Sequence, residues 1–261
     1  MVVCIFAYGN TNELEREKRM NTINISGLLK KKDRITLDVV GDSITWGITH
    51  CSDNETYTAQ FAEMLAKKFS KAAVYRYDGI THDELKPMEG FSDAHRVSAG
   101  NCGKRIDVIR NGIGGNTVRR AINRIQDFTG TLANEKTADI TFFMFGINDA
   151  LKTEKSKYVT PEKFYDDYTE LLEKFKATEK SQVVIMSATT NDQPINEYVK
   201  TTEKFANEHN ILYINQNKVW TTHYDKSMPN FGHGDWLSSD PCHPTPKGAN
   251  AIAKEMMRYV V

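Results

Sequence analysis

The sequence predicts an α/β domain in which helices cover both faces of a parallel sheet. Two observations lead to this prediction. From about residue 35 onward, short runs of β-branched and apolar residues alternate with longer amphipathic runs. The short runs are apolar throughout, as is expected for strands that are buried on both faces of a parallel sheet. The length of 261 residues is sufficient for one such domain with a large core.

Five short runs have the length and composition of strands. Val, Ile, Phe and other residues that favour strands dominate them, and polar or turn-forming residues flank them. We therefore expect strands at residues 35–40, 106–109, 140–145, 183–186 and 211–214.

Five longer runs carry apolar residues at helical spacing. In the first run, Phe61 and Leu65 stand one helical turn apart. Pro161 opens the third run, and Thr245 and Pro246 have the residue types of an N-cap and a first helical position. We therefore expect helices over residues 56–70, 117–128, 161–176, 195–209 and 246–259.

Three stretches fall outside this alternation. Residues 1–34 are predicted to form a peripheral N-terminal extension, which places the main domain at residues 35–261. The connections at residues 71–105 and 215–240 are long for a compact domain, and long connections are often functional. The alternative for both connections is surface decoration without a functional role.

Composition and charge argue against several classes of protein. Lys and Arg together number 34, as do Asp and Glu, so the formal charge is zero and no nucleic-acid partner is expected. No apolar run is long enough to span a bilayer, so integral membrane association is not expected. The apolar start at residues 1–7 is short and lacks a basic leader, which favours a cytoplasmic protein; a mature secreted form remains an alternative. The neutral charge is compatible with a homo-oligomer.

The four cysteines are Cys4, Cys51, Cys102 and Cys242. They show no CxxC spacing, and a domain of this size does not need disulfides, so free thiols are expected. A disulfide between Cys51 and Cys102 is the alternative.

Residues that can take part in catalysis or ligand binding follow three of the predicted strands and precede the last helix. Gly-Asp-Ser stands at 41–43, a glycine-rich segment at 112–117, Gly-Ile-Asn-Asp at 146–149 and Asp-Pro-Cys-His-Pro at 240–244. Each motif alone is also common in turns and helix caps. Because ligands of an open parallel sheet bind beyond the carboxyl ends of its strands, the ordered set predicts a single site.

The residue types at these places suit acyl transfer. Ser43 carries a hydroxyl that a base can activate, and Asn148 carries an amide that can donate to a developing oxyanion. Asp240 and His243 stand three residues apart on a turn with prolines, which can place a carboxylate against an imidazole. For the glycine-rich segment a phosphate cradle is the alternative, but that segment lacks the P-loop ending and the Gly-x-Gly-x-x-Gly pattern.

Together, the four motifs resemble the four sequence blocks of the SGNH/GDSL hydrolases, from about Ile35 to the C-terminus. The resemblance implies a carboxylic ester hydrolase that works through an acyl-enzyme. It also implies a flavodoxin-like three-layer α/β/α domain with a five-stranded parallel sheet in the order 2-1-3-4-5. Neither a cofactor nor a metal ion is expected, because this chemistry needs none and the histidines form no H-x-H or H-E-x-x-H pair.

By motif position, the resemblance assigns Ser43 as the nucleophile, His243 as the general base and Asp240 as the residue that orients His243. The oxyanion hole is assigned to the backbone N–H groups of Ser43 and Gly115 and to the side-chain amide of Asn148.

This sequence departs from the family pattern at one place. Many members carry Asn two residues before the first glycine of the second block, where Arg110 stands here and Asn111 follows. The difference affects how the second block of the family aligns with this sequence, so Gly114 is the alternative to Gly115 as the oxyanion donor.

Four aromatic residues are candidates for substrate contact: Trp46 just after Ser43, and Trp220, Tyr224 and Trp236 in the connection at 215–240. Because aromatic faces suit sugar rings, we expect a short acyl ester, acetate first, on a carbohydrate, so that the partner is a small-molecule or oligosaccharide ester. The alternative is that the tryptophans are packing residues. No long apolar lid is evident, and a lysophospholipase or thioesterase remains a further alternative.

Two other classes of function are weighed against the esterase. One is a catalytically inactive carbohydrate-binding protein, which the presence of all the motif residues disfavours. The other is a metal-dependent phosphoesterase that uses Asp42, Asp149, Asp240 and His243. This set of residues contains too few carboxylates for that chemistry.

Overall fold

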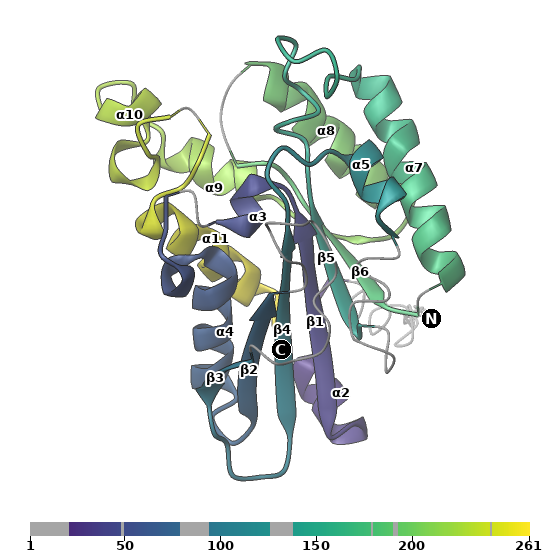
Figure 1. The fold of residues 1–261 in the computed structure, drawn as a ribbon, viewed down its shortest axis with the longest axis vertical. Coiled ribbons are helices and arrows are strands. Elements are labelled where there is room, and N and C mark those ends of the chain that lie inside the picture. Colours follow the sequence, from purple (N-terminus) through teal and green to yellow (C-terminus); the bar gives the residue numbers. More distant parts are fainter. Residues whose placement is uncertain are drawn as a thin grey trace, which may run out of the picture.

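The computed structural model describes residues 21–47, 50–78, 94–125, 138–178, 180–189, 193–240 and 242–261. Within these residues, seven strands form one sheet in the order β3-β2-β4-β1-β5-β6-β7 (Figure 1). All neighbouring strands pair in parallel except β2 and β3, which are antiparallel. The strands are β1 (Arg34–Gly41), β2 (Ala73–Asp78), β3 (His95–Ser98), β4 (Arg105–Gly112), β5 (Ile140–Met144), β6 (Gln182–Met186) and β7 (Leu212–Ile214).

The prediction of an α/β fold with a mostly parallel sheet is confirmed, whereas the prediction of five strands is wrong. The five predicted strands are β1, β4, β5, β6 and β7, and they lie in the predicted order. Strands β2 and β3 extend the sheet beyond β4, inside the predicted connection 71–105. Their residues are mostly half-buried or exposed, so neither strand has the continuous apolar pattern that marks the central strands.

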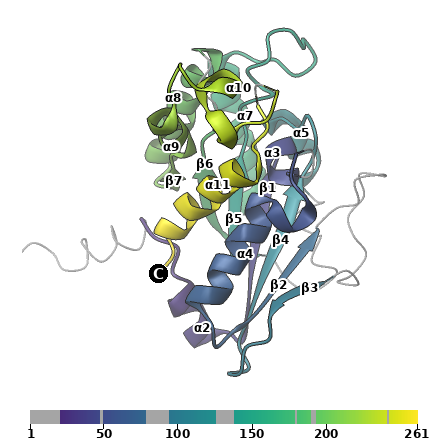
Figure 2. The ribbon, with the colours of Figure 1, turned by 90° about the vertical axis from the view of Figure 1, so that its left-hand side faces the viewer.

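Helices cover both faces of the sheet (Figures 1 and 2). Helices α4 (Tyr57–Lys68) and α11 (Pro246–Arg258) pack against each other on one face. On the other face, α7 (Pro161–Thr178) packs against α5 (Val118–Asn123) and α8 (Gln193–Glu208). These five helices lie where the amphipathic runs predicted them, although the predicted end of the second helix, at residues 126–128, is outside the described residues.

The described part of the predicted N-terminal extension contacts the domain. Ile23 forms a parallel bridge with Val260, and both Ile23 and Ile25 are fully buried. Helix α2 (Ile25–Lys31) then leads into β1, with the side chain of Asn24 capping its first turn. Residues 1–20 lie outside the described residues. The first described residues therefore contact the C-terminal residues of the chain.

The connection at 215–240 contains regular structure rather than a plain loop. It holds α9 (Gln216–His223), α10 (Pro229–Gly232) and the short 3-10 helix η2 (Gly234–Trp236). Near the N-terminal half, α3 (Ser43–Trp46) and the 3-10 helix η1 (Asp53–Glu55) follow β1. Among the described residues, none of the helices combines the length and hydropathy that a membrane span requires.

The cysteines within the described residues are free thiols. Cys51 is buried, Cys102 is exposed and Cys242 is half-buried. The alternative of a Cys51–Cys102 disulfide is therefore wrong, and Cys4 lies outside the described residues.

The end of β4 lies so close to α3 that only glycine fits there. A Cβ atom added to Gly112 would overlap the backbone of Thr45 and Trp46, whereas a Cβ on Gly114 would meet only the Trp46 ring at 3.8 Å. We expect Gly112→Ala to push α3 away from the sheet and to destabilise the fold by about 1–3 kcal/mol, the usual cost of overpacking. Gly114→Ala is the matched control and is expected to have the wild-type melting temperature. Equal melting temperatures for the two variants would contradict this close packing.

Candidate active site

Ser43 stands at the point where β1 turns directly into α3. Asp42 is the N-cap of α3, and its carboxylate accepts a hydrogen bond from the Ile44 N–H at 2.9 Å. This local bond holds Ser43 as the first helical residue, beyond the carboxyl end of the sheet. Its backbone N–H makes no hydrogen bond within the described part of the chain, as is usual in the first turn of a helix.

Asp240 and His243 stand on a tight turn just before α11. An antiparallel bridge between Leu237 and Pro244 closes the turn, and the Ser238 N–H donates to the His243 carbonyl at 3.0 Å. Inside the turn, Oδ1 of Asp240 accepts hydrogen bonds from the backbone N–H groups of Cys242 at 2.9 Å and His243 at 2.8 Å. The position of the Asp240 carboxylate relative to His243 is therefore set by backbone hydrogen bonds.

The structure joins Ser43, His243 and Asp240 in one chain of hydrogen bonds. Oδ2 of Asp240 lies 2.9 Å from Nδ1 of His243, and Nε2 of His243 lies 2.8 Å from Oγ of Ser43. These three residues are 200 positions apart at the extremes, and the fold brings them together from the end of β1 and the start of α11. The arrangement has the order hydroxyl, imidazole, carboxylate that activates a serine.

Electrostatics fix the proton on His243. Burial alone would raise the pKa of Asp240, but the N–H groups of Cys242 and His243 and the His243 ring outweigh it and hold the pKa far below its usual range. Asp240 is therefore a carboxylate at neutral pH, and a carboxylate can only accept hydrogen bonds. The neutral His243 ring must then carry its proton on Nδ1, which leaves the lone pair of Nε2 facing Ser43.

The loops after β4 and β5 are tied to the end of β1. The strand register places Gly112 and Met144 beside Gly41, so residues just beyond all three strands share one edge of the sheet. Asn116 bridges them, because its side chain donates to the Gly41 carbonyl at 3.3 Å and its own carbonyl accepts from Nδ2 of Asn148 at 2.9 Å.

This arrangement keeps donors available at the edge of the sheet where Ser43 stands. The Asn148 amide has two N–H bonds and uses one of them on Asn116, which leaves the second for a ligand. Gly115 has a left-handed backbone with φ of 70°, and its N–H has no hydrogen-bond partner among the residues that the structure describes. Gly114 has no such backbone constraint.

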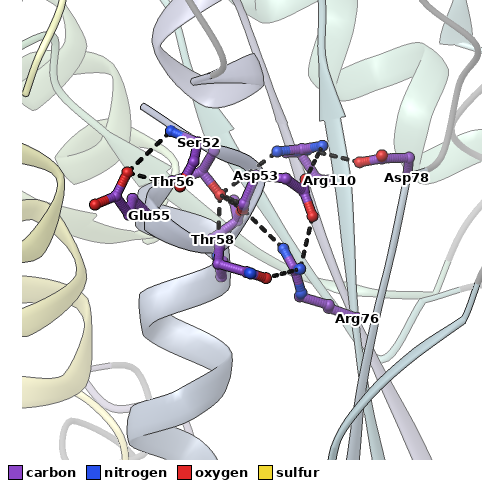
Figure 3. A network of polar contacts seen from close by, with 10 residues as sticks. Ser52, Asp53, Glu55, Thr56, Thr58, Arg76, Asp78 and Arg110 are labelled. Atoms are coloured by element: carbon purple, nitrogen blue, oxygen red, sulfur yellow. Dashed lines mark hydrogen bonds and ion pairs between the residues drawn. The ribbon is translucent and has the colours of Figure 1, made fainter. Parts of the chain in front are cut away.

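Arg110, which stands where many family members carry Asn, has a structural role. Arg110 points from β4 to Asp78 at 2.6 Å and to Asp53 at 2.8 Å, and Arg76 binds Asp53 at 2.6 Å (Figure 3). The ion pairs hold η1 against the carboxyl ends of β2 and β4. Asn111, the next residue, is buried and donates to Asp38 at 2.6 Å within the sheet.

One residue at the site, His50, was not predicted from the sequence. Its Nε2 lies 2.6 Å from Oδ2 of Asp240, the same oxygen that accepts from His243, and the two imidazole rings are 5.4 Å apart. Within the described residues, His50, Asp240 and His243 are the only group of three side chains with metal-binding atoms close together. No motif or spacing in the sequence connects His50 with Asp240.

Two further carboxyl groups, in the segments that follow β1 and β5, are buried. Burial raises the pKa of Asp42 to about 7 and that of Asp149 to about 8. Oδ1 of Asp149 accepts from the Val118 N–H at 3.1 Å, at the start of α5. Neither residue belongs to the cluster around Asp240, so the four-residue set weighed for a metal-dependent phosphoesterase is not assembled among the described residues.

The four aromatic candidates are not brought together. Trp220 is fully buried against Trp236, His233 and Gly248, so its predicted contact with substrate is wrong: no face of the ring is free. Trp236 stacks on His223 at 3.6 Å and lines a groove between α4, α9 and α11 that contains none of the triad residues. Tyr224 is 43% exposed and contacts His233, and its substrate contact remains a prediction.

Trp46 is the aromatic candidate that lies beside Ser43. It ends α3, one helical turn after the serine, and its ring is half-buried against Gly114 in the loop after β4. Trp46 therefore remains a candidate for substrate contact.

A comparison with protein-family models matches residues 39–256 to the GDSL-like lipase/acylhydrolase model. No curated protein matches the chain. Among solved structures, the acetyl xylan esterase AlAXEase is similar to this chain with a TM-score of 0.63 and 20% identity, over 87% of this chain and all of that one.

Two further solved structures support the same fold. LAE5, an α/β hydrolase from the metagenome of Lake Arreo in Spain, matches with a TM-score of 0.59 and 20% identity, over 86% of this chain and 94% of that one. Axe2, an acetylxylan esterase from Geobacillus stearothermophilus, matches with a TM-score of 0.56 and 21% identity, over 86% and 93%.

The raised pKa of Asp149 predicts a pH-dependent effect of Asp149→Asn. An unfolded carboxyl titrates near pH 4, so between about pH 4 and pH 8 the folded chain binds more protons than the unfolded chain, and stability falls as pH rises. The variant loses this penalty while its amide oxygen can still accept from Val118. We compare the melting temperature of the variant with that of the wild type at each pH. We expect the difference, variant minus wild type, to be several degrees larger at pH 8 than at pH 5, since 1 kcal/mol corresponds to about 2–4 °C in a chain of this size. A difference that stays constant between the two pH values would contradict a buried, titrating Asp149.

Proposed function

The chain belongs to the GDSL-like lipase/acylhydrolase family, and on that premise we propose that it removes short acyl groups, acetyl first, from a carbohydrate ester. Family membership confirms the prediction of a carboxylic ester hydrolase. The observation that carries the proposed mechanism is the line of hydrogen bonds from Ser43 through His243 to Asp240. An inactive binding protein has no need to keep these contacts.

In the proposed reaction, Ser43 attacks the ester carbonyl and His243 takes the hydroxyl proton on Nε2. Asp240 stays ionised and stabilises the resulting imidazolium through Nδ1. His243 then gives the proton to the leaving alcohol, which leaves the acyl group on Ser43. Water enters, and His243 removes its proton and returns it to Ser43 as the acid is released.

The proposed oxyanion hole has three donors from three neighbouring strand ends. They are the N–H of Ser43 after β1, the N–H of Gly115 after β4 and the second N–H of the Asn148 amide after β5. The first two have no partner in the described part of the chain, and the third is held in place by Asn116. Such donors act on the charge that forms in the transition state, and one is typically worth about 3–4 kcal/mol.

Two observations support an acetylated carbohydrate as the substrate. Solved structures of similar fold include acetyl xylan esterases, at 20–21% identity. Within this chain, Trp46 places a half-buried indole one helical turn from Ser43. An aromatic face next to the nucleophile suits a sugar ring that carries the ester, so we assign the alcohol contact to Trp46.

A panel of esters tests the proposal. We expect kcat/KM to fall from p-nitrophenyl acetate to the butyrate and octanoate esters, and we expect acetate release from acetylated xylo-oligosaccharides. Trp46→Ala is expected to lower kcat/KM for the oligosaccharide several-fold, since one aromatic contact contributes about 0.5–1.5 kcal/mol. The same variant should change the reaction with p-nitrophenyl acetate much less.

Tyr224→Ala is the matched comparison, because Tyr224 is an exposed aromatic residue outside the hydrogen-bonded triad. If kcat/KM for the oligosaccharide falls selectively in Tyr224→Ala and not in Trp46→Ala, the sugar contacts the 215–240 segment rather than Trp46. Faster cleavage of the octanoate than of the acetate would contradict the short acyl group and favour a lysophospholipase or thioesterase.

A further inference from the structure

His50 and His243 approach the same oxygen of Asp240 from two different chain segments. Nε2 of His50 lies 2.6 Å from Oδ2 and Nδ1 of His243 lies 2.9 Å from it. Each of the three side chains offers one ligand atom, and these atoms all lie within 4.8 Å of one another. We propose that His50, Asp240 and His243 form an inhibitory binding site for a divalent transition-metal cation, with Zn²⁺ as its representative.

The donor set determines which cations fit. Two imidazole nitrogens and one carboxylate oxygen suit Zn²⁺, which commonly takes three protein ligands and leaves its fourth position to water. Mg²⁺ and Ca²⁺ prefer sets made of oxygen atoms. In a tetrahedral site with bonds of about 2.1 Å, donor atoms are roughly 3.4 Å apart. The contacts to Oδ2 of Asp240 would therefore need to lengthen by less than about 1 Å when the cation replaces the shared protons.

The ligands are held in place by the surrounding structure. His50 precedes η1, which the Asp53 ion pairs with Arg76 and Arg110 fix to the sheet (Figure 3). Asp240 is fixed by backbone N–H groups of its own turn. The His50, Asp240 and His243 side chains are 32%, 34% and 19% exposed, so a cation can reach them from solvent. The site therefore forms if the ligand atoms, which already lie within 4.8 Å of one another, shift by distances on the order of 1 Å.

Cation binding would change the tautomer of His243. In the proposed reaction the neutral ring carries its proton on Nδ1 and presents the lone pair of Nε2 to Ser43. A cation bound to Nδ1 needs the lone pair of that atom, so the proton moves through solvent to Nε2. The ring then donates towards Ser43 and cannot accept the hydroxyl proton. The Nδ1–H bond breaks and an Nε2–H bond forms, so the ring keeps one proton. The loaded enzyme cannot activate its nucleophile.

Inhibition rests on the proposed function, whereas binding does not, so the two are measured separately. Zn²⁺ is titrated into the tag-free full chain and into Ser43→Ala by calorimetry, and p-nitrophenyl acetate hydrolysis by the wild type is followed in parallel. Both proteins are expected to bind one Zn²⁺ per chain. Activity should fall in proportion to occupancy and return with EDTA, and Mg²⁺ should have no effect.

Two histidine variants localise the site. His50→Gln keeps a side-chain N–H for Asp240 but loses the imidazole ligand, and we expect its Kd for Zn²⁺ to rise at least about tenfold, the minimum typical of changes around a metal. His223→Gln is the control, because His223 stacks on Trp236 away from Asp240, and its Kd should stay within twofold of the wild type.

Three results would overturn the proposal. They are the absence of Zn²⁺ binding to the wild type, an unchanged Kd in His50→Gln, and full activity of the Zn²⁺-loaded enzyme. Binding that depends on His50, in a chain that shows no hydrolysis before Zn²⁺ is added, would support the cation site and count against the esterase. Failure of the cation site and failure of the esterase therefore give different results.

Discussion

The hydrogen bonds that meet on the Asp240 carboxylate determine the state of the other groups at the site. Backbone N–H groups of Cys242 and His243 hold one oxygen, and the His243 ring binds the other. Because these bonds keep Asp240 ionised, they place the imidazole proton on Nδ1 and direct the Nε2 lone pair at Ser43. The second oxygen also contacts His50. One carboxylate therefore links the proposed base to a second histidine, with which it forms the proposed inhibitory cation site.

The sheet supplies the other half of the site. Strands β4, β1 and β5 are neighbours with Gly41, Gly112 and Met144 in register, so the residues that follow them stand along one edge. Close approach of α3 to β4 requires Gly112, and Asn116 ties the loop after β4 to β1 and to Asn148. The buried Asp42 and Asp149 stand in the segments that follow β1 and β5. Burial raises the pKa of both, so these carboxyl groups reduce stability as the pH rises.

Much of the fold and the triad could be predicted, because both leave local signals in the sequence. The buried central strands are continuous apolar runs, and Ser43, Asn148 and Asp240 follow strands or precede a helix at recognisable motifs. Strands β2 and β3 lack such a signal because they are mostly half-buried or exposed at the sheet edge. His50 was missed because its contact with Asp240 spans 190 positions and depends on tertiary structure. Trp220 was misassigned because burial depends on the packing of α9 and η2 on α11, which its residue type does not reveal.

Covalent labelling with a fluorophosphonate, read by intact-mass and peptide mass spectrometry, tests whether His243 activates Ser43 as a nucleophile. One adduct per chain is expected on Ser43, and none is expected in Ser43→Ala. In folded His243→Ala the labelling rate should fall by about 10²–10⁴-fold, the usual contribution of a general base. An adduct on another residue, or labelling of His243→Ala at the wild-type rate, would show that His243 does not activate Ser43.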